Sequence, residues 1–233
     1  MTRNLRQSVG LAGLLTVLII VLTVIATFQL SAEAAQHDVL SGDRMVSGWV
    51  QRASIPGVNY PVEFFNWIGR PIPLTLLTGL FSVALMSRRR YAEAILVLPT
   101  TATHGVNWLL KNVIQSPRPT EDHVRIQDQA TGFGFPSGHT MAIVVFCGVI
   151  VYLAWRLIEH RKWQYAVHGV VVMAVLGIGF SRIQTGAHWP SDVLGGYLWG
   201  TFYAGLLVLL FHRMLPPDGE HYDMPLLRRT RTR

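Results

Sequence analysis

The segment from Ser181 to Asp192 brings together three side chains that can act on an anion. Arg182 is a fixed cation, His188 is an imidazole and Asp192 is a carboxylate, and they lie where two long apolar segments meet. Pro190 favours the start of a helix here, because its fixed φ and missing N–H suit the first helical turn. Asp192 would then lie one turn from His188 and hold one ring nitrogen. The other ring nitrogen would be free to act as a nucleophile.

Two further groups of residues have side chains or backbone suited to an anion. Lys111 is followed after six residues by Arg118, in the loop after an apolar segment. Residues 132–139 read GFGFPSGH and directly precede another apolar segment. Small residues let the backbone approach an anion there. The N–H groups of the opening helical turn, near Ser137 and Gly138, would point at it with the helix dipole behind them.

Taken together, the three groups suit a phosphate. Guanidinium groups bind phosphate oxygens in bidentate fashion, and lysine serves as a point charge. The same groups can stabilise charge on the equatorial oxygens during phosphoryl transfer. A metal site is the alternative for His139 and His188. It would need carboxylate or further histidine ligands, and three neighbouring cations would repel the ion. We therefore expect no metal and no cofactor.

The elements that position these residues are predicted to be membrane helices. Half of the residues are hydrophobic and only 14% are charged, whereas a soluble domain carries about 25% charged residues. Windows free of charge, each near the length that crosses roughly 30 Å of hydrocarbon, cover residues 7–32, 71–87, 94–110, 140–155, 163–181 and 193–211. We expect an all-α bundle of six transmembrane helices forming a single domain over residues 1–233. The first apolar stretch is longer than the core of a secretory signal, so we expect it to be retained.

The distribution of Lys and Arg predicts the orientation. Thirteen of the 20 basic residues fall on one side of the six-helix arrangement, which is typical of the cytoplasmic side. They are Arg3, Arg6, Arg88, Arg89, Arg90, Arg156, Arg161, Lys162, Arg213, Arg228, Arg229, Arg231 and Arg233. The three groups of candidate site residues fall on the other side, outside the cytoplasm. The net charge of +7 then mostly reflects topology.

The two polar ends of this arrangement also have predicted roles. Residues 214–233 form a cytoplasmic basic tail without interleaved aromatic residues, so we expect contact with anionic lipid head groups and no nucleic-acid partner. Residues 33–70 form an extracytoplasmic loop rich in aromatic residues. This loop either lies in the membrane interface as an amphipathic segment or packs over the helix bundle. The single Cys147, within an apolar run, excludes an intrachain disulfide framework.

The three groups of residues resemble a known signature. Lys111-x6-Arg118-Pro119, Pro136-Ser137-Gly138-His139 and Ser181-Arg182-x5-His188-x3-Asp192 are similar, in order and without a departure, to the three-part signature of the type 2 phosphatidic acid phosphatase family. The signature spans residues 111–192. The six-helix layout resembles the membrane branch of this family over nearly the whole chain.

This resemblance implies a metal-independent phosphatase with a core helical bundle. It implies that His188 is the nucleophile that forms a phosphohistidine, that Asp192 orients it, and that His139 is the general acid that protonates the leaving oxygen. Water would then hydrolyse the intermediate. The phosphate would be held by Lys111, Arg118, Ser137, Gly138 and Arg182.

Three functions remain open at this point. The first is a lipid phosphatase at the outer face of a bacterial cytoplasmic membrane, acting on undecaprenyl diphosphate, phosphatidylglycerophosphate, phosphatidate or a lipid A phosphate that arrives sideways from the bilayer. The second is a lipid-to-lipid phosphotransferase of the same family. The third is a vanadate-dependent haloperoxidase, which shares the anion pocket but is soluble, so the apolar spans argue against it. The sequence specifies neither the lipid nor the oligomeric state.

Overall fold

The computed structural model describes residues 2–36, 39–40, 42–52 and 59–214, and every regular element in these ranges is a helix. In chain order they are α1 (Thr2–Ala34), α2 (Asp43–Arg52), α3 (Asn59–Ile68), α4 (Pro71–Ser87), α5 (Tyr91–Val97), the 3₁₀ helix η1 (Leu98–Ala102), α6 (Thr103–Ile114), α7 (Gly138–Leu157), α8 (Arg161–Gln184) and α9 (Pro190–Met214). The all-α prediction is therefore confirmed for the described part of the chain.

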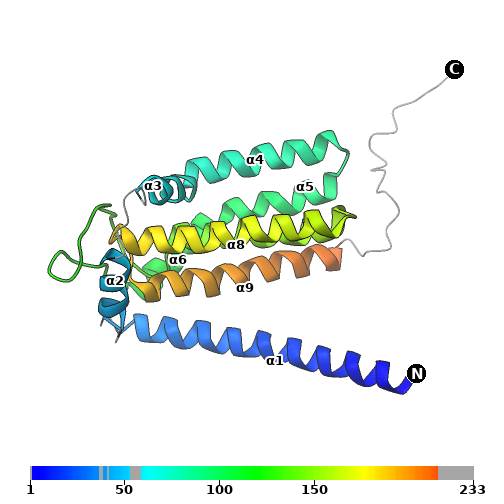
Figure 1. Cartoon of the computed structure of the whole chain (residues 1–233), viewed down its shortest axis with the longest axis horizontal. Helices are drawn as coiled ribbons and strands as arrows, with labels where there is room; N and C mark the ends of the chain where they lie inside the picture. The colour runs from blue at the N-terminus through cyan, green and yellow to red at the C-terminus, as the bar shows by residue number, and fades with distance from the viewer. Residues whose placement is uncertain (1, 37–38, 41, 53–58, 215–233) are drawn as a thin grey trace.

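The long helices lie side by side along the molecule (Figure 1). The short helices α2 and α3 lie at one end of this bundle, beside the loop that joins α6 to α7. The turn between α4 and α5 lies at the opposite end (Figure 1). The loop between α6 and α7, the start of α7 and the turn between α8 and α9 all belong to the end with α2 and α3.

The helix α7 forms the centre of the bundle and packs mainly against α9 and α8. Its residues Met141, Val145 and Val149 are spaced four apart, so they share one side of the helix, and none has exposed surface. Apolar residues of α4, α5, α8 and α9 complete the same core. The start of α7, with Ser137 at the N-cap and His139 in the first turn, both of the third candidate group, is thereby held on a rigid element.

Two glycines of α9 allow it to lie unusually close to α7. A Cβ atom at Gly196 would lie 2.9 Å from the carbonyl oxygen of Ser137, and one at Gly200 would lie 2.8 Å from Cβ of Val144. Any side chain at either position would therefore push the two helices apart. The close approach brings the first turn of α9, which contains Asp192, against the first turn of α7.

Among the described residues, four helices are long and apolar enough to cross a membrane: residues 17–34 of α1, and the whole of α7, α8 and α9. The pair formed by α3 and α4 passes the same test together, with a bend of 67° between them, so the number rises to five if this pair counts as one span. Large apolar side chains such as Leu80, Val172 and Leu209 are exposed on the bundle, as expected where the solvent is lipid.

The prediction of six transmembrane helices is not confirmed by these lengths. The predicted span at residues 94–110 is divided among α5, η1 and α6, and each piece is too short to cross a bilayer alone. Pro99 lies inside η1 and has no N–H to continue the hydrogen bonds of α5. The predicted span at residues 71–87 corresponds to α4, which has 17 residues. Six crossings therefore stay a prediction.

In the segment at residues 33–70, α3 packs partly on the bundle, and its placement in the membrane interface stays a prediction. On α3, the side chains of Tyr60, Phe64 and Trp67 are exposed, whereas Phe65 packs against Gly177 of α8. The helix thus has one aromatic face directed outward and one face packed on the bundle. Residues 215–233, the larger part of the predicted basic tail, lie outside the described residues.

Candidate active site

The three groups of candidate residues converge at the end of the bundle that carries α2 and α3. Lys111 comes from the last turn of α6, and Arg118 from the loop that follows it. His139 lies in the first turn of α7, and Arg182 in the last turn of α8. His188 lies in the short turn between α8 and α9. Residues that span 78 positions of sequence therefore meet at one end of the molecule.

His188 and Asp192 form a buried hydrogen-bonded pair. Nδ1 of His188 lies 3.1 Å from Oδ2 of Asp192, and the two side chains are 3% and 1% exposed. The helix α9 begins at Pro190, as the sequence predicts, which places the carboxylate one turn from the imidazole. The backbone N–H of Trp189 donates to the same Oδ2 at 3.0 Å. These hydrogen bonds fix the orientation of the His188 imidazole and of the Asp192 carboxylate.

Arg118 faces the other nitrogen of the same imidazole. Its Nη1 lies 3.2 Å from Nε2 of His188. Because a guanidinium group only donates, Nε2 must be the unprotonated nitrogen, and Nδ1 carries the proton donated to Asp192. This is the tautomer in which the Nε2 lone pair is directed toward a cation.

Burial and positive charge keep this imidazole neutral. Burial lowers the pKa of His188 well below its usual value, and the nearby charges of Lys111 and Arg118 lower it further. A neutral imidazole retains the lone pair that a nucleophile needs. The same cations would neutralise an anion bound beside Nε2.

The cations Arg118 and Lys111 are held mainly by backbone carbonyl groups of the glycine-rich loop. Arg118 donates through Nε to the oxygen of Gly132 at 2.9 Å and through Nη1 to the oxygen of Ala187 at 2.7 Å. Lys111 donates through Nζ to the oxygens of Phe133 at 2.5 Å and Gly134 at 2.7 Å. Neither cation is neutralised by a carboxylate at these contacts.

The start of α7 differs in one respect from the expected cradle of backbone donors. The N–H of Ser137 already donates to the carbonyl oxygen of Asp192 at 2.9 Å, which ties α7 to α9. The N–H groups of Gly138, His139 and Thr140 open the helix and have no intrahelical acceptor, whereas the N–H of Met141 donates to the carbonyl oxygen of Ser137 at 2.9 Å. Gly138 also allows Asn107 to pack closely, since a Cβ atom there would lie 2.8 Å from its Oδ1.

His139 lies beneath the junction of α3 and α4. A Cβ atom at Gly69 would be 3.0 Å from Cδ2 of His139, so this junction covers the imidazole directly. Within the described part of the chain, the ring nitrogens of His139 make no hydrogen bond. They therefore remain able to exchange a proton with a bound group.

Arg182 has two partners that the sequence analysis missed. Its side chain is 1% exposed, and Nη1 donates to Oδ1 of Asn66 and, at 2.8 Å, to Oδ2 of Asp128. Asn66 comes from α3 and Asp128 from the loop between α6 and α7, at 116 and 54 positions from the arginine. The one local sign was a lone amide in the otherwise apolar end of α3.

No group of three or more His, Cys, Asp or Glu side chains that could hold a metal ion occurs among the described residues. The carboxylates near the site, Asp128 and Asp192, are each engaged by a cation or an imidazole. The donor set near His188 thus consists of cations and hydrogen-bond donors, which suits an anion.

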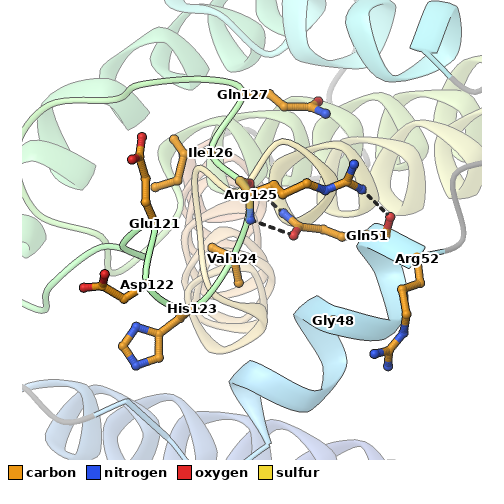
Figure 2. Close-up of a pocket in the computed structure, with 10 residues that line it drawn as sticks. All are labelled: Gly48, Gln51, Arg52, Glu121, Asp122, His123, Val124, Arg125, Ile126 and Gln127. Carbon is orange, nitrogen blue, oxygen red and sulfur yellow. Dashed lines mark hydrogen bonds between the residues drawn. The ribbon is translucent and has the colours of Figure 1, made fainter.

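A separate open hollow of about 880 Å³ lies beside this site, between α2 and the loop between α6 and α7 (Figure 2). It is lined by Gly48, Gln51, Arg52, Glu121, Asp122, His123, Val124, Arg125, Ile126 and Gln127. None of the candidate catalytic or phosphate-binding residues lines it. Figure 2 shows Gln51 directed at Arg125, and the two are joined by hydrogen bonds of 2.8 and 3.0 Å through the Arg125 backbone.

The fold and the site together define a class of protein: a helical bundle with apolar spans, in which cations and imidazoles meet at one end. The family comparison is more specific. The model of the PAP2 superfamily matches residues 92–215, more than half of the chain, and the chain belongs to this superfamily. The resemblance drawn from the three signature groups is therefore confirmed.

Related proteins carry names of phosphatases. The chain is 28% identical to phosphatidylglycerophosphatase B of Bacillus subtilis, over 73% of this chain and 84% of the relative. It is 29% identical to an undecaprenyl-diphosphatase of Sulfolobus acidocaldarius, over 66% of this chain and 71% of the relative. The chain is thus an integral membrane enzyme of the PAP2 phosphatase type.

A solved structure supports the same fold. The transmembrane PAP2-type phosphatidylglycerolphosphate phosphatase of Bacillus subtilis superposes with a TM-score of 0.71, at 23% identity. The superposition covers 85% of this chain and 98% of that structure. It therefore extends beyond the matched family region into the N-terminal helices.

Proposed function

We propose that this protein hydrolyses a membrane lipid phosphomonoester or diphosphate through a phosphohistidine on His188. The observation that carries the proposal is the orientation of the His188 ring. Nδ1 is fixed on Asp192, and the unprotonated Nε2 faces Arg118. A phosphoryl group bound to Arg118 would be presented to that lone pair.

In the first step, Nε2 of His188 attacks the phosphorus atom, and the bond from phosphorus to the leaving oxygen breaks. The proton on Nδ1 remains shared with Asp192, which stabilises the positive charge that develops on the ring. His139 supplies a proton to the leaving oxygen, so the dephosphorylated lipid departs as a neutral alcohol or with one phosphate fewer. Splitting the reaction into two displacements lowers each barrier.

In the second step, water attacks the phosphohistidine, and His139 takes up a proton from this water. The bond from phosphorus to Nε2 breaks, inorganic phosphate is released, and His188 returns to its neutral state. Lys111, Arg118 and Arg182 carry the charge on the equatorial oxygens through both steps, together with the N–H groups at the start of α7 near Ser137 and Gly138.

The substrate we propose is a lipid, because the site lies at the end of a membrane bundle. The candidates are undecaprenyl diphosphate, phosphatidylglycerophosphate, phosphatidate and a lipid A phosphate. The names of the relatives in Bacillus subtilis and Sulfolobus acidocaldarius favour the first two. A head group at the interface would reach the site from within the bilayer.

We further propose that the six predicted crossings form one domain, that the chain resides in a bacterial cytoplasmic membrane, and that the site faces away from the cytoplasm. The position of one basic turn supports this orientation. Arg88, Arg89 and Arg90 lie at the turn between α4 and α5, opposite the end that carries α2, α3 and the site (Figure 1). Basic residues are concentrated on cytoplasmic loops.

A panel of purified lipids tests the proposal. Wild-type protein in detergent is incubated with each of the four candidates, without any second lipid, and released phosphate is measured. A hydrolase releases phosphate in the absence of an acceptor. Release that depends on an added acceptor lipid would instead identify a phosphotransferase. Failure to release phosphate from every candidate would contradict the proposed function.

A further inference from the structure

The buried guanidinium of Arg182 is held at one nitrogen only. Nη1 donates to Asn66 and to Asp128, and these two acceptors use both of its hydrogens. Nε is fully buried, and within the described residues it has no hydrogen-bond partner. A buried, unpartnered N–H is costly, so an acceptor is expected at that position when the site is filled.

The free edge of Arg182 is the one that binds oxyanions well. Nε and Nη2 point their hydrogens in parallel, which matches two oxygens of a phosphate. Because Asn66 and Asp128 both act on Nη1, they leave this edge open. The charge of Arg182 also acts on His188, so the arginine lies within electrostatic range of the nucleophile.

Asp128 is itself fixed against the end of α8. The backbone N–H groups of Gln127 and Asp128 donate to the carbonyl oxygen of Thr185, at 2.8 and 3.3 Å. Asn66 adds a contact of 3.4 Å from its Nδ2 to Oδ2 of Asp128. The carboxylate is 31% exposed and the guanidinium 1%, so Asp128 forms the outer side of the pair.

Asn66 lies outside the part of the chain that the family model matches, which begins at residue 92. It is carried by α3, whose exposed Tyr60, Phe64 and Trp67 suit the membrane interface. Gly69, the residue directly after this helix, lies against His139. The helix and the turn that follows it thus contact both a phosphate-binding candidate and the candidate general acid.

We propose that Asn66 and Asp128 are positioning residues that hold Nη1 of Arg182, so that the Nε and Nη2 edge is presented to the phosphate of the substrate. This inference rests on the proposed function. The two residues touch the arginine and not the reacting atoms. Their removal therefore loosens the grip on the phosphate without removing the nucleophile.

The first experiment measures Asn66→Ala, Asp128→Ala and Asp128→Asn in the lipid assay. We expect kcat/KM to fall about tenfold to a hundredfold for the two alanine variants, because a misplaced binding group costs about that much. Asp128→Asn keeps an acceptor oxygen and should lose less. Glu63→Ala, exposed on the same helix, and Asp122→Asn, exposed in the same loop, serve as matched controls and should behave as wild type.

The second experiment measures binding of orthovanadate, a phosphate analogue, from its inhibition constant and from the thermal shift it produces. Weaker binding in the alanine variants, by a factor similar to the loss in kcat/KM, supports the positioning role. Unchanged binding in both variants would overturn it. Tighter binding in Asp128→Ala would also overturn it, since Asp128 would then compete with the anion for the arginine.

A double-mutant cycle with Arg182→Lys separates positioning from general stability. Lysine lacks the fork, so Asn66→Ala and Asp128→Asn should have little further effect in that background, less than about twofold. If Asn66→Ala and Asp128→Asn lower kcat/KM as much in the lysine background as they do in wild type, their role is merely structural and the inference is overturned. If wild-type protein hydrolyses no candidate lipid, the proposed function fails, and the thermal shift with orthovanadate still tests the positioning role.

Discussion

Nε2 of His188 lies 3.2 Å from Nη1 of Arg118, on the side of the ring opposite the bond to Asp192. The guanidinium of Arg118 donates hydrogen bonds and cannot accept them, so it fixes the tautomer of the almost completely buried His188 imidazole. In the proposed mechanism, the nitrogen nearest the cation is the reactive one. The predictions below depend on it directly or through the residues that hold it.

Replacing His188 by alanine should abolish phosphate release, with a loss of at least about a thousandfold, because the covalent route disappears. Membrane insertion and the thermal unfolding midpoint in detergent should change little. Released phosphate and the midpoint are measured on the same preparation. Near-normal rates in this variant would remove His188 from the role of nucleophile.

Replacing Asp192 by asparagine should lower kcat by about 10²- to 10⁴-fold, as in other enzymes where a carboxylate holds a catalytic histidine. The amide no longer stabilises the charged ring, and its NH₂ group favours the wrong tautomer. The position of His188 should be retained. Single-turnover and steady-state assays separate this effect on kcat from an effect on substrate binding. An unchanged kcat would show that the hydrogen bond between His188 and Asp192 is dispensable.

The pH dependence of activity follows from the environment of His188. Burial first, and then the charges of Lys111 and Arg118, lower its pKa well below the usual 6.5. The ring stays neutral as the pH falls through 6.5, so the acid loss of kcat/KM that belongs to this group should begin below that value. A pH profile of kcat/KM with an acid limb centred at or above pH 6.5 would contradict it.

The same lowered pKa has a consequence for stability. The unfolded chain binds a proton at this histidine more readily than the folded chain does. Stability from this group is therefore fully present above the unfolded pKa and is lost progressively as the pH falls below about 6.5. His188→Asn should reduce that slope when thermal midpoints are measured between pH 7.5 and 5.

Hydrolysis should persist in excess EDTA. The candidate site gathers cations and hydrogen-bond donors around the phosphate position, and these groups repel a divalent ion. Phosphate release is measured with the chelator and again after addition of Mg²⁺. Strict dependence on the added metal would contradict the proposed mechanism.

Replacing Gly196 by alanine should destabilise the bundle by about 1–3 kcal/mol, because the new Cβ atom would lie 2.9 Å from the carbonyl oxygen of Ser137. Activity should fall with it, since α9 carries Asp192. Gly205→Ala is the matched control on the same helix, where nothing lies within 4 Å. It should match or slightly exceed the wild-type midpoint. Equal midpoints for both variants would show that the two helices can separate without cost.

The relation of His188 to Asp192 could be predicted from sequence because the two residues are four positions apart and a helix starts between them at Pro190. Local geometry alone sets their distance. The convergence of Lys111, Arg118 and the start of α7 could also be expected, since each lies at a helix end on the same side of a charge-counted topology. Short-range rules suffice for such features.

Asn66 and Asp128 could not be predicted in the same way. They approach Arg182 from distant positions, and neither has a spacing that points to the arginine. The number of membrane crossings also could not be determined from charge-free windows alone. Such a window at residues 94–110 does not register that Pro99 interrupts the helix. Long-range packing and backbone continuity decide these features.

The use of peptide oxygens to hold Lys111 and Arg118 has a final consequence. The carbonyl groups of Gly132, Phe133 and Gly134 cannot gain a proton in water, so acidification does not remove these anchors. Lys111 and Arg118 differ in this respect from Arg182, whose partner Asp128 is a carboxylate that acid can protonate.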